Sequence, residues 1–188
     1  MKKYLLIAVA ALAAFAYVSC NQDNEVTGKD TIDYSKLVIN EANAVAATDS
    51  AKFVELYNGG DKDIPLKDVY INRTDEAGLV ELTWKGIDGE VVPAKGFFVI
   101  QGTKEALSRS MIKGLSAKKG VKLEVFGPDD ASITSVQHGI LTDASAKTKI
   151  QTGIWARIPD GGAWKNVTNE TPGRANDATG AKDDDELK

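Results

Sequence analysis

The sequence contains very few of the residues on which common catalytic and metal sites depend. Its 188 residues include one cysteine, Cys20, and one histidine, His138. A single cysteine cannot form an intrachain disulfide, and it excludes the multi-cysteine sites that hold structural zinc. A single histidine excludes zinc motifs built on two histidines. Any chemistry would therefore have to rest on carboxylates, hydroxyl groups or His138.

Basic residues are also outnumbered in this chain. There are 23 Lys and Arg against 27 Asp and Glu, which gives a formal net charge of −4. Sequence-independent binding of nucleic acid depends on clusters of Lys and Arg. Beyond the N-terminal region, Lys118 and Lys119 form the only adjacent basic pair. We therefore expect no nucleic-acid partner.

The N-terminus has the pattern of a secretory signal peptide. Lys2 and Lys3 precede residues 4–18, which carry no charge and are mostly Leu, Ile, Ala and Val. A charged start followed by an apolar run is typical of such leaders. The run is about 15 residues long, whereas a helix needs ~20 to span a bilayer core. Residues 1–19 are therefore predicted to be a cleaved signal rather than a permanent anchor.

The position of Cys20 gives the lone cysteine a function. The preceding residues, Tyr17, Val18 and Ser19, make a context that resembles the lipobox of bacterial lipoproteins. The resemblance implies cleavage before Cys20 and lipidation of its thiol. Each buried CH₂ of an acyl chain contributes roughly 0.8 kcal/mol to membrane binding. We expect a lipid-anchored protein of the bacterial cell envelope, at the outer membrane or cell surface; the alternative is an unpaired leftover cysteine.

Polar segments flank a single domain. Residues 20–33 are rich in Asp and Asn and poor in apolar residues, so they are predicted to be a flexible tether. Residues 34–176 have the length of one domain. Residues 177–188, DATGAKDDDELK, are predicted to be an acidic disordered tail.

The domain has the pattern of short β-strands separated by turns. Apolar residues alternate with polar ones, as around Leu37 and Ile39 or Val54 and Leu56, and Gly, Pro, Asn and Asp lie between the runs. Only residues 103–113 have a spacing closer to a helix. Many short strands at this length favour an all-β sandwich or barrel. The predicted strands lie within residues 36–42, 52–58, 66–72, 79–84, 96–102 and 121–127.

Four stretches, in this order, resemble the lamin tail domain, an immunoglobulin-like β-sandwich. They are VINEAN (residues 38–43), FVELYN (53–58), WARIPDGGAW (155–164) and TPGRAN (171–176). The resemblance implies that the motif residues are structural. These residues are Asn40, Glu41, Glu55, Asn58, Arg157, Asp160, Gly161, Trp164, Thr171, Pro172, Gly173 and Asn176.

The resemblance implies a fold and an interaction module, but no reaction. In nuclear proteins, lamin tail domains bind other proteins. In bacteria, they accompany secreted nucleases and phosphoesterases or stand alone on lipoproteins. We expect a non-enzymatic module that binds a protein or glycan through loops such as 58–64 and 127–132, or through a sheet edge. The alternatives are a carbohydrate-binding module and an accessory domain linked to a nuclease or phosphoesterase. The flanking segments are too short to hold such a catalytic domain.

Two carboxylates are candidates for a catalytic pair. Glycoside hydrolysis uses two carboxyl groups that flank one bond, and Glu41 and Glu55 could supply them. Both residues lie in strand patterns that belong to the fold, so we expect them to hydrogen-bond the backbone or Arg157. Arg157 is predicted to be half-buried and paired with Glu41 or Glu55, because an unpaired buried charge is strongly destabilising.

His138 is the one candidate base for a Ser-His-Asp triad, with Asp143 nearby in the sequence. The chain lacks a G-x-S-x-G nucleophile elbow. His138 lies in VQHGIL, where a strand pattern runs into a turn, and we expect it to be solvated.

Acidic pairs in turns are candidates for calcium. The pairs Asp61 and Asp63, and Asp129 and Asp130, could offer oxygen ligands, but no EF-hand loop is present. Asp is also a normal turn residue. We expect neither a metal nor another cofactor.

Aromatic residues could form a platform for stacking on sugars. The candidates are Trp84, Trp155, Trp164, Tyr57 and Tyr70. Such residues more often pack in a core. Trp164 is expected to belong to the fold, and Trp84, before a Lys-Gly turn, is expected to be the most exposed.

Overall fold

The computed structural model describes residues 31–48, 51–103, 111–113, 115–139, 141, 143, 145 and 153–188. The predicted signal peptide, Cys20 and most of the predicted tether lie outside the described residues. The described part begins with exposed residues and a short 3-10 helix, η1 (Tyr34–Lys36), in which the Ser35 N–H donates to the Asp33 carboxylate. No helix among the described residues is long and apolar enough to cross a membrane.

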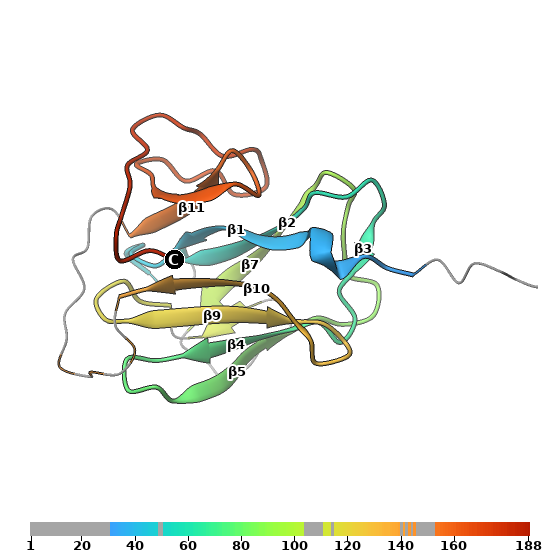
Figure 1. The fold of residues 1–188 in the computed structure, drawn as a ribbon, viewed down its shortest axis with the longest axis horizontal. Coiled ribbons are helices and arrows are strands. Elements are labelled where there is room, and N and C mark those ends of the chain that lie inside the picture. The colour runs from blue at the N-terminus through green and yellow to red at the C-terminus, as the bar shows by residue number, and fades with distance from the viewer. Residues whose placement is uncertain are drawn as a thin grey trace, which may run out of the picture. The chain divides into compact units, whose positions relative to one another are not determined.

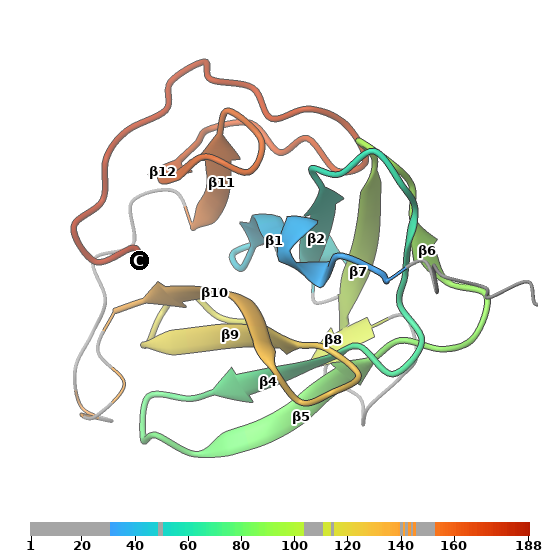
Figure 2. The ribbon, with the colours of Figure 1, turned by 45° about the vertical axis from the view of Figure 1, so that its right-hand side comes forward.

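Two β-sheets face each other (Figures 1 and 2). In spatial order, the first contains β12 (Ala163–Asn166), β11 (Ile154–Ile158), β1 (Leu37–Asn43), β2 (Phe53–Asn58), β7 (Phe97–Thr103) and β8 (Met111–Lys113). The second contains β10 (Ser132–His138), β9 (Val121–Phe126), β4 (Tyr70–Thr74) and β5 (Val80–Lys85). β3 (Ile64–Pro65) and β6 (Val91–Val92) form a separate pair. β7 and β8 pair in parallel and the other neighbours pair antiparallel, which confirms the predicted immunoglobulin-like β-sandwich.

The apolar residues of the strand patterns meet between the sheets. In β9, Val121, Leu123 and Val125 are buried and the residues between them are half-exposed. This is the period-two pattern of a strand with one face on the core. The largest fully buried side chains are Trp84 and Trp155. The aromatic residues proposed for a sugar platform therefore include two that lie in the core.

The burial of Trp84 contradicts the expectation that it is exposed, and a β-bulge explains the difference. Strict alternation along β5 would place Trp84 on the same outer face as Leu82. However, Leu82 is opposite Asn72 while Trp84 is opposite Ile71, so β5 holds one extra residue, Thr83. The extra residue turns the following side chain to the other face of the sheet. Trp84 therefore points into the core.

The predicted helix at residues 103–113 is wrong at both ends. Thr103 belongs to β7 and residues Met111–Lys113 form β8, which pairs with β7. Residues 104–110 lie outside the described residues. Parallel pairing of Met111–Lys113 with residues 101–103 overrides the local helical spacing.

Residues 177–188, predicted to be a disordered tail, instead return to the sandwich (Figure 2). Lys182 pairs with Asn166 of β12, and Leu187 pairs with His138 of β10. Leu187 is buried and belongs to the hydrophobic core. The composition of this segment is typical of a solvated tail, but strand pairing and one buried leucine hold it in place.

Candidate functional site

The lamin-tail motif residues converge on Asn40, the extra residue of a bulge in β1. Ile39 is opposite Leu56 and Glu41 is opposite Glu55, so Asn40 has no partner in the β1–β2 register. A bulge redirects side chains, and here Asn40 is fully buried. This placement allows the Asn40 amide to reach chain segments on both sides of β1.

The Asn40 side chain joins three groups. Its Nδ2 donates to Glu55 Oε1 at 3.1 Å and to Asp160 Oδ1 at 3.0 Å. Its Oδ1 accepts from the backbone N–H of Gly161 at 3.0 Å. Gly161 has φ +72°, in the left-handed region that favours glycine. One amide therefore ties β1 to β2 and to the β11–β12 turn.

The carboxylates of Glu41 and Glu55 hold the segment that carries the TPGRAN motif. Thr171 N–H donates to Glu41 Oε1 at 3.0 Å, and the Thr171 hydroxyl donates to Glu41 Oε2 at 2.8 Å. Gly173 N–H donates to Glu55 Oε2 at 2.6 Å. Asn176 closes the segment, because its Nδ2 donates to the carbonyl oxygen of Asn40 at 3.1 Å. The motif at 171–176 is therefore a strap fastened across β1 and β2.

Burial controls the ionisation of these two carboxyl groups. Both side chains are fully buried. Burial raises the pKa of Glu41 above its ordinary value, against the hydrogen bonds from Thr171. Burial also raises the pKa of Glu55 to about 7, and the nearby Glu41 and Asp160 charges act in the same direction. Glu55 therefore titrates near neutral pH while it holds Gly173.

Arg157 is half-buried, but the predicted ion pair with Glu41 or Glu55 is wrong. Its Nε donates to the carbonyl oxygen of Ile39 at 2.8 Å, and its Nη1 donates to that of Gly162 at 2.7 Å. The guanidinium lies 4.7 Å from the centre of the Trp164 ring, a cation–π distance. Burial lowers the pKa of Arg157. Backbone carbonyls and an aromatic face take the place of the expected carboxylate.

Two motif residues lie outside this network. Asn58 is buried, and its Nδ2 donates to the carbonyl oxygens of Lys62 and Val92 at 2.8 and 3.1 Å. Asn58 therefore shapes the 58–64 loop that was proposed for recognition. Pro172 is exposed.

His138 was expected to be solvated, and the structure places it in the interior. Its side chain is 1% exposed, and its ring stacks on Trp155 with the centroids 4.7 Å apart. His138 Nε2 lies 3.4 Å from Asp184 Oδ2. Burial lowers the pKa of His138, against the nearby Asp184 and Glu186 charges. The expectation was wrong because the segment that covers His138 is more than 40 residues away in the sequence.

Sequence reasoning missed Asp184 and Leu187 as neighbours of His138. No feature of the neighbouring sequence distinguishes Asp184 from the acidic residues beside it. Leu187, however, is the single large apolar residue in DATGAKDDDELK. That isolated leucine was the available signal that the segment docks.

The buried carboxylates are closed to a substrate. An open pocket of about 740 Å³ lies beside the strap and is lined by Ile154 and by residues between 168 and 177. Thr171 forms part of its wall, but the Thr171 amide and hydroxyl are turned to Glu41. A catalytic carboxylate must reach the reacting bond. Glu41 and Glu55 instead act as internal hydrogen-bond acceptors.

The acidic pairs proposed for calcium include side chains that accept hydrogen bonds from backbone N–H groups. Asp63 Oδ1 accepts from the Ala94 N–H at 2.9 Å, and Asp129 Oδ1 accepts from the Ala131 N–H at 3.2 Å. Within the described part of the chain, no three His, Cys, Asp or Glu side chains are grouped closely enough to hold a metal ion.

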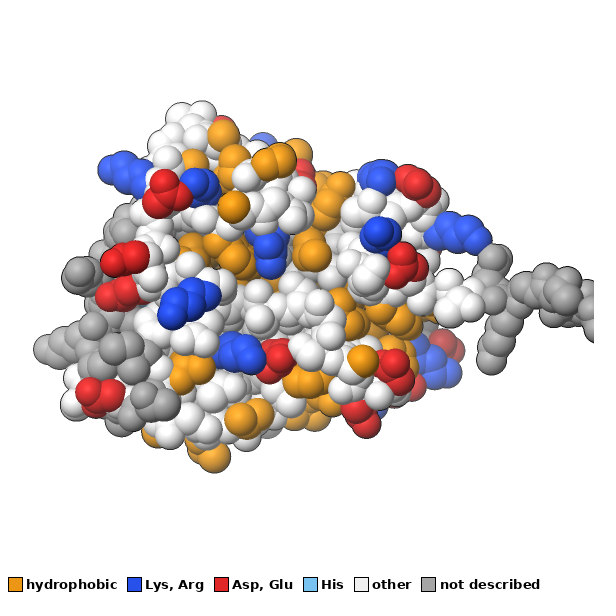
Figure 3. All heavy atoms as spheres, viewed as in Figure 1, with side chains coloured by type: hydrophobic (Ala, Val, Ile, Leu, Met, Phe, Trp, Pro, Cys, Tyr) orange, Lys and Arg blue, Asp and Glu red, His pale blue; other side chains and the backbone are white. Residues whose placement is uncertain are grey.

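An exposed apolar surface lies at the edge strand β5. Leu79, Val80 and Leu82 are 61%, 57% and 45% exposed, and we call these three residues the β5 edge patch. Hydrophobic side chains are visible along the lower edge of the molecule, where β5 runs (Figure 3). Single exposed apolar residues are normal, whereas neighbouring ones mark interaction sites. The patch is therefore a candidate binding surface.

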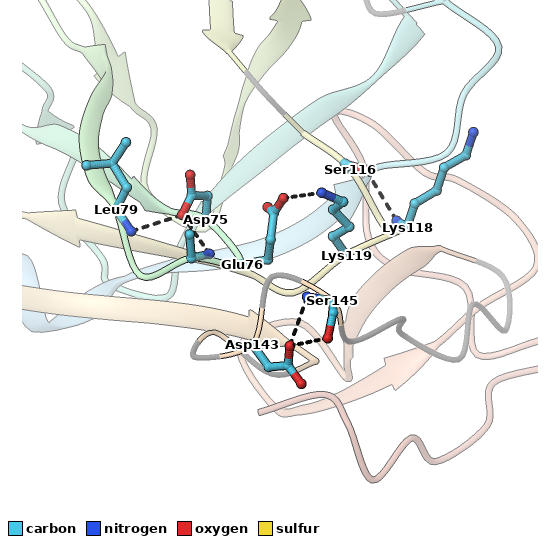
Figure 4. Close-up of polar contacts among 9 residues, drawn as sticks. Asp75, Glu76, Leu79, Ser116, Lys118, Lys119, Asp143 and Ser145 are labelled. Carbon is cyan, nitrogen blue, oxygen red and sulfur yellow. Dashed lines mark hydrogen bonds and ion pairs between the residues drawn. The ribbon is translucent and has the colours of Figure 1, made fainter.

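The turn that presents the β5 edge patch is held by side-chain contacts. Asp75 Oδ1 accepts from the N–H groups of Ala77 and Leu79, both at 2.9 Å. Glu76 forms an ion pair with Lys119 of the loop before β9. Figure 4 shows these contacts, with the Leu79 side chain pointing away from them. A fixed turn lowers the entropy lost when a partner orders the surface.

Solved structures include two that are only loosely similar to this chain. No curated protein matches the chain. Among solved structures, the archaellum periplasmic stator protein FlaG from Sulfolobus acidocaldarius is 15% identical, with a TM-score of 0.34, and covers 54% of this chain and 96% of its own. The FlaF and FlaG stator complex of the same organism is 14% identical, with a TM-score of 0.34, and covers 59% and 93%. Neither likeness bears on function.

The family model gives a firmer result than these structures. The model described as Lamin Tail Domain matches residues 31–185. This range includes the Asn40 network and reaches into the segment that covers His138. The chain therefore belongs to the lamin tail domain family.

Proposed function

We propose that the protein is a non-enzymatic interaction module of the bacterial cell envelope. Lipidated Cys20 anchors it to the membrane, the following polar residues serve as a tether, and the sandwich binds a protein partner through the β5 edge patch. The observation that carries this proposal is the exposure of Leu79, Val80 and Leu82 on a turn held by side-chain contacts. Burial of apolar surface is the main favourable term in most protein association.

The placement of the ionisable residues supports a binding role over a hydrolytic one. Glu41, Glu55 and His138 are buried and hold other segments of the chain. Among the aromatic candidates for a glycan platform, Trp84 and Trp155 lie in the core. Trp164 is half-buried beneath Arg157. A protein partner therefore fits the described surface better than a glycan.

The test of the β5 edge patch is a triple substitution, Leu79→Ser, Val80→Thr and Leu82→Thr. Purified wild-type domain is immobilised, envelope proteins that bind it are identified, and binding of the purified partner is measured by calorimetry. Because the three side chains are already exposed, the variant should remain folded. We expect it to lose partner binding by at least about tenfold, since each buried aliphatic side chain contributes on the order of 1.5 kcal/mol.

The matched control is Val91→Thr, which changes an exposed valine on β6 that is 40% exposed. It should bind the partner as the wild type does. Equal binding by the triple variant and this control would show that the patch is not the binding surface. A glycan array and assays with nucleic acids and phosphoesters belong to the same experiment. Turnover that disappears in Glu41→Gln or Glu55→Gln would contradict a non-enzymatic module.

Membrane anchoring is tested separately at the cysteine. Cys20→Ala should abolish incorporation of labelled fatty acid and move the protein from the membrane fraction to the soluble fraction, because the thiol is the attachment atom. Ser19→Ala is the control, since it keeps a small residue before the cysteine and should stay labelled. Persistent labelling or membrane association of Cys20→Ala would exclude the lipoprotein hypothesis.

A further inference from the structure

Residues 182–188, which we call the closing segment, pair with two sheet edges through isolated bridges at Lys182 and Leu187. Between the bridges the chain makes a tight turn, in which the Leu187 N–H donates to the Asp184 carbonyl at 3.2 Å. Asn166 N–H donates to the Lys182 carbonyl at 2.9 Å, and Lys182 N–H donates back to the Asn166 carbonyl at 2.8 Å. Gln137 and Lys188 exchange two such bonds, both at 2.8 Å. β12 and β10 are the outermost named strands on this side of their sheets. The closing segment therefore occupies backbone groups that would otherwise be open to another strand.

Two side chains of the closing segment enter the protein. Leu187 is buried in the core. The Asp184 side chain is 1% exposed; its Oδ2 accepts from Asn166 Nδ2 and lies 3.4 Å from His138 Nε2. Asp184 Oδ1 also accepts from the Glu186 N–H at 3.0 Å. The two side chains of this segment that are buried in the protein are therefore a carboxylate, Asp184, and a leucine three residues later, Leu187.

The rest of the closing segment contributes little buried surface. Lys182, Asp183, Asp185 and Lys188 are exposed. The single ion pair of Asp183 is with Lys165, and exposed pairs contribute at most about 1 kcal/mol. Backbone pairing at a sheet edge together with pockets for individual side chains is also how peptide ligands bind to sheets. The closing segment is thus held in the way that a peptide ligand is held.

We propose that the edge of β10, with the His138 and Asn166 side chains and the apolar site that holds Leu187, is a binding site for a peptide that pairs with this edge and turns as residues 184–187 do. The peptide carries a carboxylate three residues before a leucine, and the closing segment occupies the site within the same chain. A partner segment with this pattern replaces the closing segment and pairs with the same sheet edge. This inference rests on the proposed binding function and assigns it a second surface, distinct from the β5 edge patch.

The experiment makes the closing segment exchangeable in the full chain. A protease site is inserted at Gly180, in an exposed turn with φ +72°, and the folded chain is then cut. Fluorescent peptide KDDDELK, the sequence of residues 182–188, is added and its binding is followed by anisotropy. The cut chain should bind the peptide, whereas the uncut chain should bind it at least about a hundredfold more weakly. The tethered segment competes at an effective concentration that reaches the millimolar range.

Variant peptides test the recognition pattern. Peptides with Leu187→Ala or Asp184→Asn should bind at least about tenfold more weakly, because one loses a buried side chain and the other a charged hydrogen-bond acceptor. The control peptide, Asp185→Asn, changes an exposed residue and should bind as the parent does. A His138→Phe chain, which keeps the stacking on Trp155, should reduce the difference in affinity between the parent peptide and the Asp184→Asn peptide, whereas a merely structural role would leave that difference unchanged.

A second variant covers the case in which cutting disturbs the fold. The uncut chain with Leu187→Ala should gain binding of the KDDDELK peptide, since its own closing segment is weakened. Equal binding of all peptides, unfolding of the cut chain, or a cut segment that never exchanges would overturn the proposal. Synthetic peptide and purified protein suffice, so failure here leaves the β5 edge patch experiment unaffected, and the reverse is also true.

Discussion

Asn40→Ala is expected to lower the free energy of unfolding by about 3–5 kcal/mol. The substitution removes the donor of two hydrogen bonds, to Glu55 and Asp160, and the acceptor of one, from Gly161. A buried polar group left without a partner costs about 1–3 kcal/mol, and more when it is charged. Only a few mechanisms lower the free energy of unfolding by this amount, and disruption of a buried hydrogen-bond network is one of them. The measurement is urea unfolding followed by tryptophan fluorescence.

Two further variants give this prediction its control. Asn72→Ala changes a half-exposed asparagine on β4 and should cost less than about 1 kcal/mol. Asn40→Asp keeps the shape but points an acceptor oxygen at two carboxylates, so it should be at least as destabilising as Asn40→Ala at neutral pH. A loss below about 1 kcal/mol for Asn40→Ala would mean that Asn40 does not organise the network.

The contribution of Glu55 to the stability of the folded protein is expected to fall by about 2–3 kcal/mol as the pH rises from 5 to 8. Burial raises the pKa of Glu55 to about 7 in the folded protein. In the unfolded chain the pKa of a glutamate is about 4.3, and each unit of difference corresponds to 1.36 kcal/mol. The folded state holds a proton that the unfolded state has released. The stabilising contribution is therefore fully present below about pH 4.5 and is lost as the pH rises through about 7.

Glu55→Gln isolates this effect, because glutamine does not titrate. The comparison is of denaturant unfolding at each pH, and the difference between wild type and variant should change by about 2–3 kcal/mol between pH 5 and 8. His138, whose pKa is lowered by burial, acts in the opposite direction below about pH 6.5, but it is present in both proteins and cancels. A constant difference across the range would show that Glu55 is ionised in the folded protein throughout.

These two predictions concern the part of the fold that holds residues 171–176. Glu55 binds Gly173, and Glu41 binds Thr171. The carboxylates thus act on the chain itself, which leaves partner recognition to exposed edges. A rise in pH ionises Glu55 at a buried position, so the loss of stability comes from desolvation of the charge and not from a weaker hydrogen bond with Gly173.

Several features of the fold follow from local pattern. The alternation in β9 predicts its buried face, and the same holds for Leu37 and Ile39 in β1. The four motif stretches predict the lamin tail domain, which the family model confirms. They also indicate which residues form a structural network, although not how those residues are bonded. The signal peptide and lipidation of Cys20 remain predictions, since they lie outside the described residues.

Other features of the fold depend on contacts between residues that are far apart in the sequence. Arg157 donates to the carbonyl oxygen of Ile39, which is 118 residues away, and Thr171 donates to Glu41, which is 130 residues away. The expected order of the strands therefore could not identify the true partner of Arg157. A single extra residue in β5 reversed the face of Trp84.

The strand pattern, the family resemblance and the leader-like N-terminus can thus be recognised without a structure, because they depend on neighbouring residues. The tertiary structure decided the burial of His138 and the docking of Asp184 and Leu187. Composition alone makes residues 177–188 a solvated tail. They dock because two sheet edges and an apolar socket, assembled from distant segments, offer them backbone partners and a place for one leucine.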